Sequence, residues 1–202
     1  MINIYLVRHG QTEANIKMRF QGHQDNPLNE LGLKQAEEVA KRFKNIKLDA
    51  IYSRPLLRAK QTAKPLAEDK QLPIQIIPGL QEISFGKWEG LTFTAIKEQW
   101  PEELNAFFTK PKDTKIPEGE SFKDLEDRAF PPFDKVVRSL EDGTSIAVVS
   151  HGGVVRALEC AAIGIDLNNV WNIAVDNSSV SLLQFYNNHY LLKTHNSTGE
   201  IE

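Results

Sequence analysis

The chain begins with an apolar run that ends in Leu6-Val7-Arg8-His9-Gly10. Residues 2 to 7 are mostly aliphatic or aromatic, which is typical of a buried strand in a parallel sheet. Such sheets bind ligands at the carboxyl ends of their strands, where Arg8 and His9 fall. The planar guanidinium of arginine suits phosphate oxygens, and neutral histidine carries a nucleophilic nitrogen near pH 7. The pair therefore suggests a histidine that attacks a phosphorus atom held by arginine, although such a pair alone is more commonly structural.

Length and composition are those of an ordinary globular protein. With 202 residues, the chain predicts a single domain, 1–202, that has room for an insertion at about 86–120. Hydrophobic residues make up 41% and charged residues 25%, and the net charge of −3 favours neither nucleic acid nor an anionic membrane as a partner. The single cysteine, Cys160, lies in an apolar helical pattern, which indicates core packing. A signal-like segment and a run of about 18 apolar residues are both missing, so we expect a cytoplasmic location and no membrane association.

The first half of the chain alternates strand and helix patterns. Helix patterns cover 30 to 43 and about 56 to 68, and strand patterns cover 48 to 52, closed by Pro55, and 74 to 77. This order predicts a parallel sheet with right-handed crossovers.

The second half is less regular. The segment 86 to 120 holds all but one of the tryptophans, and we expect one or two helices there, over the site. Ser121 is placed to cap a helix that runs to about 140, and Pro131-Pro132 should kink or split it. A buried strand at 145 to 150, a helix at 154 to 163 and a hairpin of 180–186 with 190–194 complete the prediction.

A second histidine repeats the arrangement of the first. His151-Gly152-Gly153 follows the strand at 145 to 150 directly, as His9-Gly10 follows the first strand. Glycine after each histidine lets the backbone approach a ligand closely, and free amides at the start of the second helix favour an anion. The two histidines are candidates for one shared crevice, with two unrelated structural histidines as an equally weighted alternative.

Several motifs in order give the chain a family resemblance. They are Leu6-Val7-Arg8-His9-Gly10-Gln11-Thr12, Gln21-Gly22, Arg58 with Gln61-Thr62-Ala63, Glu82 with Phe85-Gly86, Pro117-Glu118-Gly119-Glu120-Ser121 and Val148-Val149-Ser150-His151-Gly152-Gly153. The chain thereby resembles the histidine phosphatase superfamily, the phosphoglycerate mutase-like fold, over nearly its whole length. It is most similar to the shorter members, including the α-ribazole phosphatase-like, broad-specificity and phosphoserine phosphatases. Arg54 departs from the pattern, because the family more often has a small or polar residue there.

The resemblance implies a fold and a set of roles. The fold would be α/β, a three-layer α/β/α sandwich with a mostly parallel sheet and a small helical insertion over the site. His9 would be the nucleophile that forms a phosphohistidine, its other ring nitrogen donating to a backbone carbonyl. Arg8, Arg58 and His151 would hold the transferring oxygens. Glu82 would be the general acid, and Glu89, the competing carboxylate, is better read as a loop residue.

The remaining candidates carry weaker arguments. Asn15, Gln21, Gly22 and the amide of Gly152 are candidate phosphate contacts, and for Asn15 and Gln21 a local turn role is as well supported. Among the other histidines, a solvated loop position is favoured for His23 over substrate contact, and His189 and His195 are expected on the surface of the hairpin.

Three functions compete at this point. The complete residue set argues against a non-catalytic binder, and the short insertion argues against a cofactor-dependent phosphoglycerate mutase. A phosphatase for a small phosphorylated metabolite is favoured, with no metal and no cofactor. Aromatic residues of the loops, such as Phe20 and Phe85, are candidates for a pocket wall or for core filling. A homodimer is the expected assembly if one forms, with Trp171 or the last strand as its contact.

Overall fold

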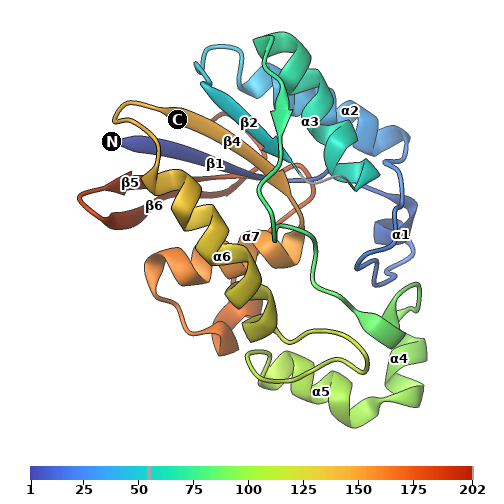
Figure 1. The fold of residues 1–202 in the computed structure, drawn as a ribbon. Helices are drawn as coiled ribbons and strands as arrows, with labels where there is room; N and C mark the ends of the chain where they lie inside the picture. Colours follow the sequence, from blue (N-terminus) through green and yellow to red (C-terminus); the bar gives the residue numbers. More distant parts are fainter. Residues whose placement is uncertain (54–55, 202) are drawn as a thin grey trace.

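The computed structural model describes residues 1–53 and 56–201. Its centre is a six-stranded sheet in the order β3-β2-β4-β1-β5-β6 (Figure 1). The strands are β1 (Ile2–Arg8), β2 (Ala50–Ser53), β3 (Ile74–Gln75), β4 (Ser145–Ser150), β5 (Val180–Tyr186) and β6 (His189–Ser197). β1, β2, β3 and β4 run parallel, whereas β5 and β6 add an antiparallel edge. The prediction of a mostly parallel α/β sheet is confirmed.

The two faces of the sheet are covered by different helices, as Figure 1 shows. Alternate side chains of β1 separate the two cores. Tyr5 and Val7 pack with residues of α2 (Glu30–Arg42) and α3 (Leu57–Lys70). Ile4 and Leu6 pack with α6 (Phe122–Arg138) and α7 (Gly152–Ile163). This alternation follows from the two-residue period of a strand, and the result is the three-layer sandwich that the family resemblance implied.

Several helices begin at polar side chains that accept hydrogen bonds from free backbone amides. Asn29 caps α2 by accepting a hydrogen bond from the Gly32 amide at 2.8 Å. Ser121 caps α6 in a reciprocal capping box with Asp124, as the sequence predicted. The predicted helix at 154 to 163 starts two residues earlier, because Gly152 and Gly153 already adopt helical geometry after His151.

One of the two outcomes predicted for Pro131-Pro132, a split helix, is wrong, and the kink stays a prediction. Pro131-Pro132 does not split α6, which runs without interruption from Phe122 to Arg138. The apolar face of α6 includes Leu125 before the prolines and Phe133 after them, and both are fully buried. Packing of that one face compensates for the lost backbone hydrogen bonds. Arg54 and Pro55, which we expected to close β2, lie outside the described residues.

The segment 86–120 contains a short 3₁₀ helix (Gly86–Trp88), α4 (Phe93–Gln99) and α5 (Pro101–Thr109). Trp88 and Phe107 are fully buried and join the core beneath α6 and α7. Phe93 and Phe108 remain exposed. The buried aromatic residues of the segment therefore extend the main core, and the expected separate core of the insertion is not found among the described residues. That these helices lie over the site stays a prediction.

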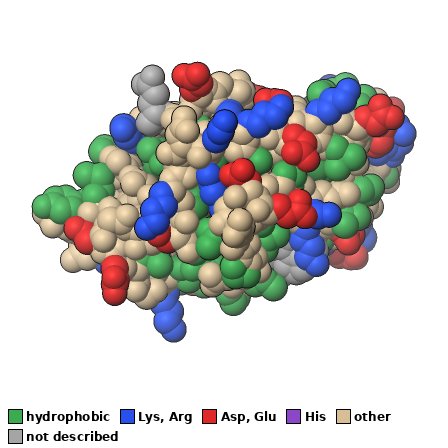
Figure 2. Space-filling model, turned by 90° about the horizontal axis from the view of Figure 1, so that it is seen from above, with side chains coloured by type: hydrophobic (Ala, Val, Ile, Leu, Met, Phe, Trp, Pro, Cys, Tyr) green, Lys and Arg blue, Asp and Glu red, His purple; other side chains and the backbone are tan. Residues whose placement is uncertain are grey.

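The last strands form the expected hairpin, and β6 is longer than predicted. Asn187 and Asn188 at its turn have positive φ values of 48° and 64°, which a two-residue hairpin turn requires. Among the residues that the structure describes, no helix is long and apolar enough to span a membrane. Figure 2 shows acidic and basic side chains interspersed on the face that it presents.

Candidate active site

His9 and His151 leave the sheet side by side. β1 and β4 are parallel neighbours, and Arg8 is in register with Ser150, so the next residue of each strand is a histidine. The His9 amide donates to Ser150 O at 2.9 Å. The two imidazole rings have their centroids 5.3 Å apart and their planes at 64°. The two histidines therefore lie side by side at the carboxyl ends of neighbouring strands, as the prediction requires, and their sharing of one ligand stays a prediction.

The His9 ring is held in one orientation. Its Nδ1 lies 2.7 Å from Gly10 O, so Nδ1 carries the hydrogen and the Nε2 lone pair is free. The Asn177 side chain donates to His9 O at 3.1 Å and to Gly10 O at 3.3 Å, which holds the turn itself. Burial, together with the charges of Arg8 and Arg58, lowers the pKa of His9 well below its ordinary value. His9 is therefore neutral at pH 7, as a nucleophile must be.

Arg8 and Arg58 are anchored through backbone carbonyls and keep donors free. Arg8 donates from Nη1 to Val175 O, and Arg58 donates to Gln24 O at 2.6 Å and Gly22 O at 2.8 Å. The Nε atoms of both guanidinium groups are buried without a hydrogen-bond partner among the described residues. Burial, and next the charge of Arg156, lowers the pKa of Arg8 to about 10, so the group stays protonated at neutral pH. Buried unpaired donors of this kind are satisfied by an anion.

His151 adds a neutral donor to these cations. The ring is fully buried, and neither of its nitrogens has a hydrogen-bond partner among residues 1–53 and 56–201. Burial, followed by the charge of Arg58, lowers the pKa of His151 well below its ordinary value. The neutral ring carries one N–H group, so its position beside His9 suits donation to an oxygen of a bound group.

Glu82 reaches the same place from a segment without regular structure between β3 and the 3₁₀ helix. Its Oε1 accepts a hydrogen bond from the Ile83 amide at 2.9 Å, and its Oε2 accepts one from the Gly153 amide at 3.2 Å. Glu89 instead accepts hydrogen bonds from the amides of His23 and Phe85, which confirms its role as a hydrogen-bonded loop residue.

Arg8, His9, Arg58 and Glu82 line a cavity of about 220 Å³, whereas His151 is fully buried beside His9 and is not among the lining residues. It is lined by Arg8, His9, Asn15, Met18, Arg19, Phe20, Gln21, Gly22, Arg58, Glu82, Ile83, Phe85, Phe122, Gly152, Gly153, Arg156 and Trp171. A concave site with an excess of guanidinium groups and one carboxylate at its wall suits a small anionic ligand.

A family model and individual relatives match the chain. The model of the histidine phosphatase superfamily (branch 1) matches residues 4–198. The chain belongs to this superfamily. "Phosphoserine phosphatase 1" of Hydrogenobacter thermophilus is 35% identical over 91% of this chain and 86% of the relative. The solved structure of the α-ribazole phosphatase from Shigella flexneri has a TM-score of 0.88 at 28% identity, covering 99% of this chain and 98% of that one. "Probable phosphoglycerate mutase GpmB" of Yersinia pestis is 32% identical over 95% of this chain and 88% of the relative. The family model and the relatives that are named as phosphatases identify the chain as a phosphatase of the histidine phosphatase superfamily.

The weaker candidates of this superfamily member face the cavity but also have structural contacts. Asn15 Oδ1 accepts a hydrogen bond from the Thr12 amide, and the Asn15 amide donates to Thr12 Oγ1, which closes a capping box at α1 (Glu13–Ile16). Gln21 Oε1 accepts from Thr12 Oγ1 at 3.0 Å and Asn26 Nδ2 at 3.3 Å. The oxygen of each amide is thus occupied within the protein, and its NH₂ group is the part suited to an anion.

Sequence reasoning missed Arg156, Asn177 and Arg19. Arg156 donates from Nε to Ile173 O at 2.8 Å, and its guanidinium lies over the Trp171 ring at 5.4 Å from the centroid. The i,i+4 spacing from Gly152 on a helix that opens at the site is the signal that would have identified Arg156. Asn177 lies before β5, and no local pattern in the sequence links it to His9.

Two further histidines are exposed as predicted and also make polar contacts within the protein. His23 lies in its loop as expected, but its Nε2 contacts Glu82 O at 2.9 Å instead of facing solvent alone. His195 lies on the hairpin, yet its Nδ1 is 3.3 Å from Oε1 of Glu159, whose side chain is fully buried. The buried Glu159 carboxylate of α7 needs a polar partner, and His195 of β6 supplies it. The surface pattern of the hairpin does not reveal this contact.

Proposed function

We propose that the protein is a phosphomonoesterase that hydrolyses a small phosphorylated metabolite through a phosphohistidine on His9. The observation that carries the proposal is the free Nε2 lone pair of a neutral His9 beside the unpaired buried donors of Arg8 and Arg58. A phosphoryl group bound to these guanidinium groups would bring its phosphorus atom to the nucleophile.

The reaction then follows in two displacements. His9 Nε2 attacks phosphorus, the bond from phosphorus to the ester oxygen breaks, and Glu82 protonates the departing oxygen. Water next attacks the phosphorus of the phosphohistidine, its proton passes to the Glu82 carboxylate, and the P–N bond breaks. Inorganic phosphate leaves, and both side chains return to their starting states. Arg8, Arg58 and the His151 N–H group would neutralise the charge on the transferring oxygens, and the Gly152 amide and the NH₂ groups of Asn15 and Gln21 would support them.

Cofactor-dependent phosphoglycerate mutase is the second candidate, and the relative named as a mutase favours it. Such an enzyme returns the phosphoryl group to a sugar-acid product and needs a bisphosphate primer. Phosphate release without a primer therefore separates the two functions.

The test is a screen of phosphorylated metabolites for phosphate release, with His9→Ala as the blank. Rapid acid-free quenching with a ³²P-labelled substrate should trap a label that is acid-labile, base-stable and located on residue 9. Activity in His9→Ala equal to that of the unchanged protein, or no such adduct during turnover, would refute the proposal. Isomerisation of phosphoglycerate that requires a primer, without net phosphate release, would favour the mutase.

Assembly and location stay predictions. Trp171 packs on Phe107 and Phe122 and donates from Nε1 to Phe107 O, so it is occupied within the chain. β6 forms an edge of the sheet and is the better candidate for a homodimer contact. Sedimentation equilibrium would measure the assembly, and fractionation of the source cells would test the cytoplasmic location.

A further inference from the structure

The segment that carries Glu82 has no regular structure to hold it. Residues 80 to 85 lie between a turn and the 3₁₀ helix, and they form neither helix nor strand. Leu80 and Ile83 are buried on either side of Glu82, so the backbone between them must find hydrogen-bond partners within the protein. A general acid on such a segment needs its main chain fixed by side chains from elsewhere.

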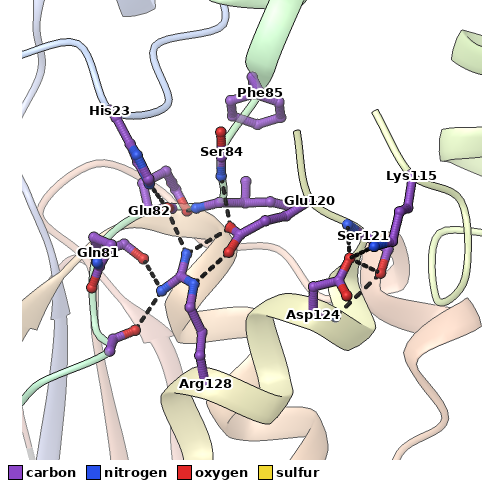
Figure 3. Close-up of polar contacts among 12 residues, drawn as sticks. His23, Gln81, Glu82, Ser84, Phe85, Lys115, Glu120, Ser121, Asp124 and Arg128 are labelled. Atoms are coloured by element: carbon purple, nitrogen blue, oxygen red, sulfur yellow. Dashed lines mark hydrogen bonds and ion pairs between the residues drawn. The ribbon is translucent and has the colours of Figure 1, made fainter. Parts of the chain in front are cut away.

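Arg128, in α6, supplies most of these partners (Figure 3). Its Nη1 donates to Gly79 O and to Gln81 O, the second at 2.9 Å, and its Nη2 donates to Glu82 O at 2.8 Å. The guanidinium therefore binds the carbonyl oxygens of Gly79, Gln81 and Glu82. Arginine suits this task because its donors form a rigid planar fork.

Glu120 completes the arrangement from the other side of the guanidinium. Its Oε1 accepts from Arg128 Nε at 2.6 Å and its Oε2 from Arg128 Nη2 at 2.8 Å. Its Oε2 also accepts from the Ser84 amide at 2.8 Å, and the Glu120 amide donates to Ser84 O at 2.9 Å. Every N–H group of the Arg128 guanidinium thus has an acceptor, and the pair spans the Glu82 segment from residue 79 to residue 84.

The ion pair is largely shielded from solvent. The Arg128 and Glu120 side chains are only 23% and 21% exposed. Burial raises the pKa of Glu120, but the hydrogen bonds from Arg128 and from the Ser84 amide outweigh it and hold this pKa below its ordinary value. Glu120 is therefore charged at neutral pH, and its bidentate contact with Arg128 restricts the guanidinium more than a surface ion pair would.

We propose that the Glu120–Arg128 pair is a positioning device for Glu82, in which Arg128 grips the backbone so that the carboxyl group stays aimed into the cavity. His23 supports the same carbonyl from the opposite loop, through Nε2 at 2.9 Å from Glu82 O. The inference rests on the proposed role of Glu82 as the general acid. Neither Arg128 nor Glu120 lines the cavity, so each acts through Glu82 and not on the substrate.

The test uses the dependence of the rate on the leaving group. The leaving group of p-nitrophenyl phosphate departs without a proton, whereas an alkyl phosphate such as O-phosphoserine needs one. We expect Arg128→Gln to lower kcat/KM for the alkyl phosphate about tenfold or more beyond any loss with the aryl phosphate. With Arg128→Lys, the loss of kcat/KM for the alkyl phosphate relative to the aryl phosphate should be smaller than with Arg128→Gln but still present, because lysine keeps the charge and lacks the planar fork. Arg138→Gln is the matched control, since Arg138 lies on the same helix and pairs with Asp134, and the ratio should not change.

A second comparison separates positioning from general loss of structure. In a Glu82→Gln background the acid is already absent, so adding Arg128→Gln should change the substrate ratio little further. Equal losses on both substrates, or the same additional loss of the ratio in the Glu82→Gln background, would overturn the proposal. If Arg128→Gln does not fold, as judged by circular dichroism, Glu120→Gln serves in its place under the same criteria. Should Glu82→Gln itself slow both substrates equally, the acid role of Glu82 fails instead, which is a distinguishable result.

Discussion

The Glu82 carboxylate lies against Gly153, at the place where a side-chain methyl group of residue 153 would stand. The Gly153 amide donates to Glu82 Oε2 at 3.2 Å, and a Cβ atom at position 153 would lie 2.5 Å from Glu82 Oε1. The clash is with the end of a side chain, which can move, and not with backbone. Because Gly153 has no side chain, the carboxylate of Glu82 can lie next to the start of α7.

Gly153→Ala is expected to fold normally but to displace the Glu82 carboxylate. Alanine is favoured over glycine in a helix by about 1 kcal/mol, and this gain should offset the cost of moving the Glu82 carboxylate. The free energy of unfolding should therefore change little. The alkyl phosphate rate should fall more than the aryl phosphate rate, as for loss of the acid. Steady-state kinetics on both substrates measure this, with Gly199→Ala, whose Cβ would meet no atom within 4 Å, as the control. Unchanged kinetics on the alkyl phosphate would contradict the prediction.

His151→Ala is expected to lower kcat about 100-fold or more while His9 can still be phosphorylated. The reason is the loss of a buried donor to the transferring oxygens, which typically reduces rates by 10²–10³. Its absence also removes a ring that packs 5.3 Å from His9. Single-turnover kinetics with p-nitrophenyl phosphate would report the phosphorylation step separately. A kcat equal to that of the unchanged protein would show that His151 is only structural.

Stability should fall as the pH is lowered below about 6.5, through His9 and His151. Both have pKa values well below the ordinary value in the folded protein, first because of burial. Between the two pKa values the unfolded chain binds protons that the folded chain does not. The contribution of the two neutral histidines to stability is therefore complete above the unfolded pKa and is lost as the pH falls. Each histidine should reduce the free energy of unfolding by up to about 1.4 kcal/mol per pH unit until its folded pKa is reached.

Urea unfolding between pH 6.5 and 5, in buffers without phosphate, measures this slope. His9→Gln should have a shallower slope, because one titrating ring is gone. His195 has the opposite shift, since the hydrogen bond to Glu159 raises its pKa, so its contribution is complete below the unfolded pKa and is lost as the pH rises above that range. His195 is present in both proteins, so its contribution cancels when their slopes are compared. Equal slopes for the two proteins would refute the assignment to His9.

Phosphatase activity is expected to survive removal of metal ions. Guanidinium groups occupy the positions around His9 where a metal would otherwise neutralise phosphate charge. Dialysis against EDTA, followed by assay in metal-free buffer, should leave kcat within about twofold of its starting value. Loss of activity that Mg²⁺ or Zn²⁺ restores would assign a metal to the site.

The sequence by itself determined the local parts of this protein. Two-residue and helical periodicities report which face of each segment is buried, so β1, β4, α2 and the hairpin turn could be predicted from nearby residues alone. The motifs around His9 and His151 likewise identified the two histidines and their glycines, because each motif lies within a few residues of one strand end.

Only the tertiary structure decided how distant segments meet. The adjacency of β1 and β4 is a property of strand order, and it brings the His9 and His151 rings together. Arg128 and Asn177 come from segments whose sequence patterns say nothing of the site. Glu82 was identified only through its family motif, and packing brings all three residues to the site. Periodicity records burial but not the partner, so contacts between residues far apart in the chain emerge only when the layers of the fold are assembled.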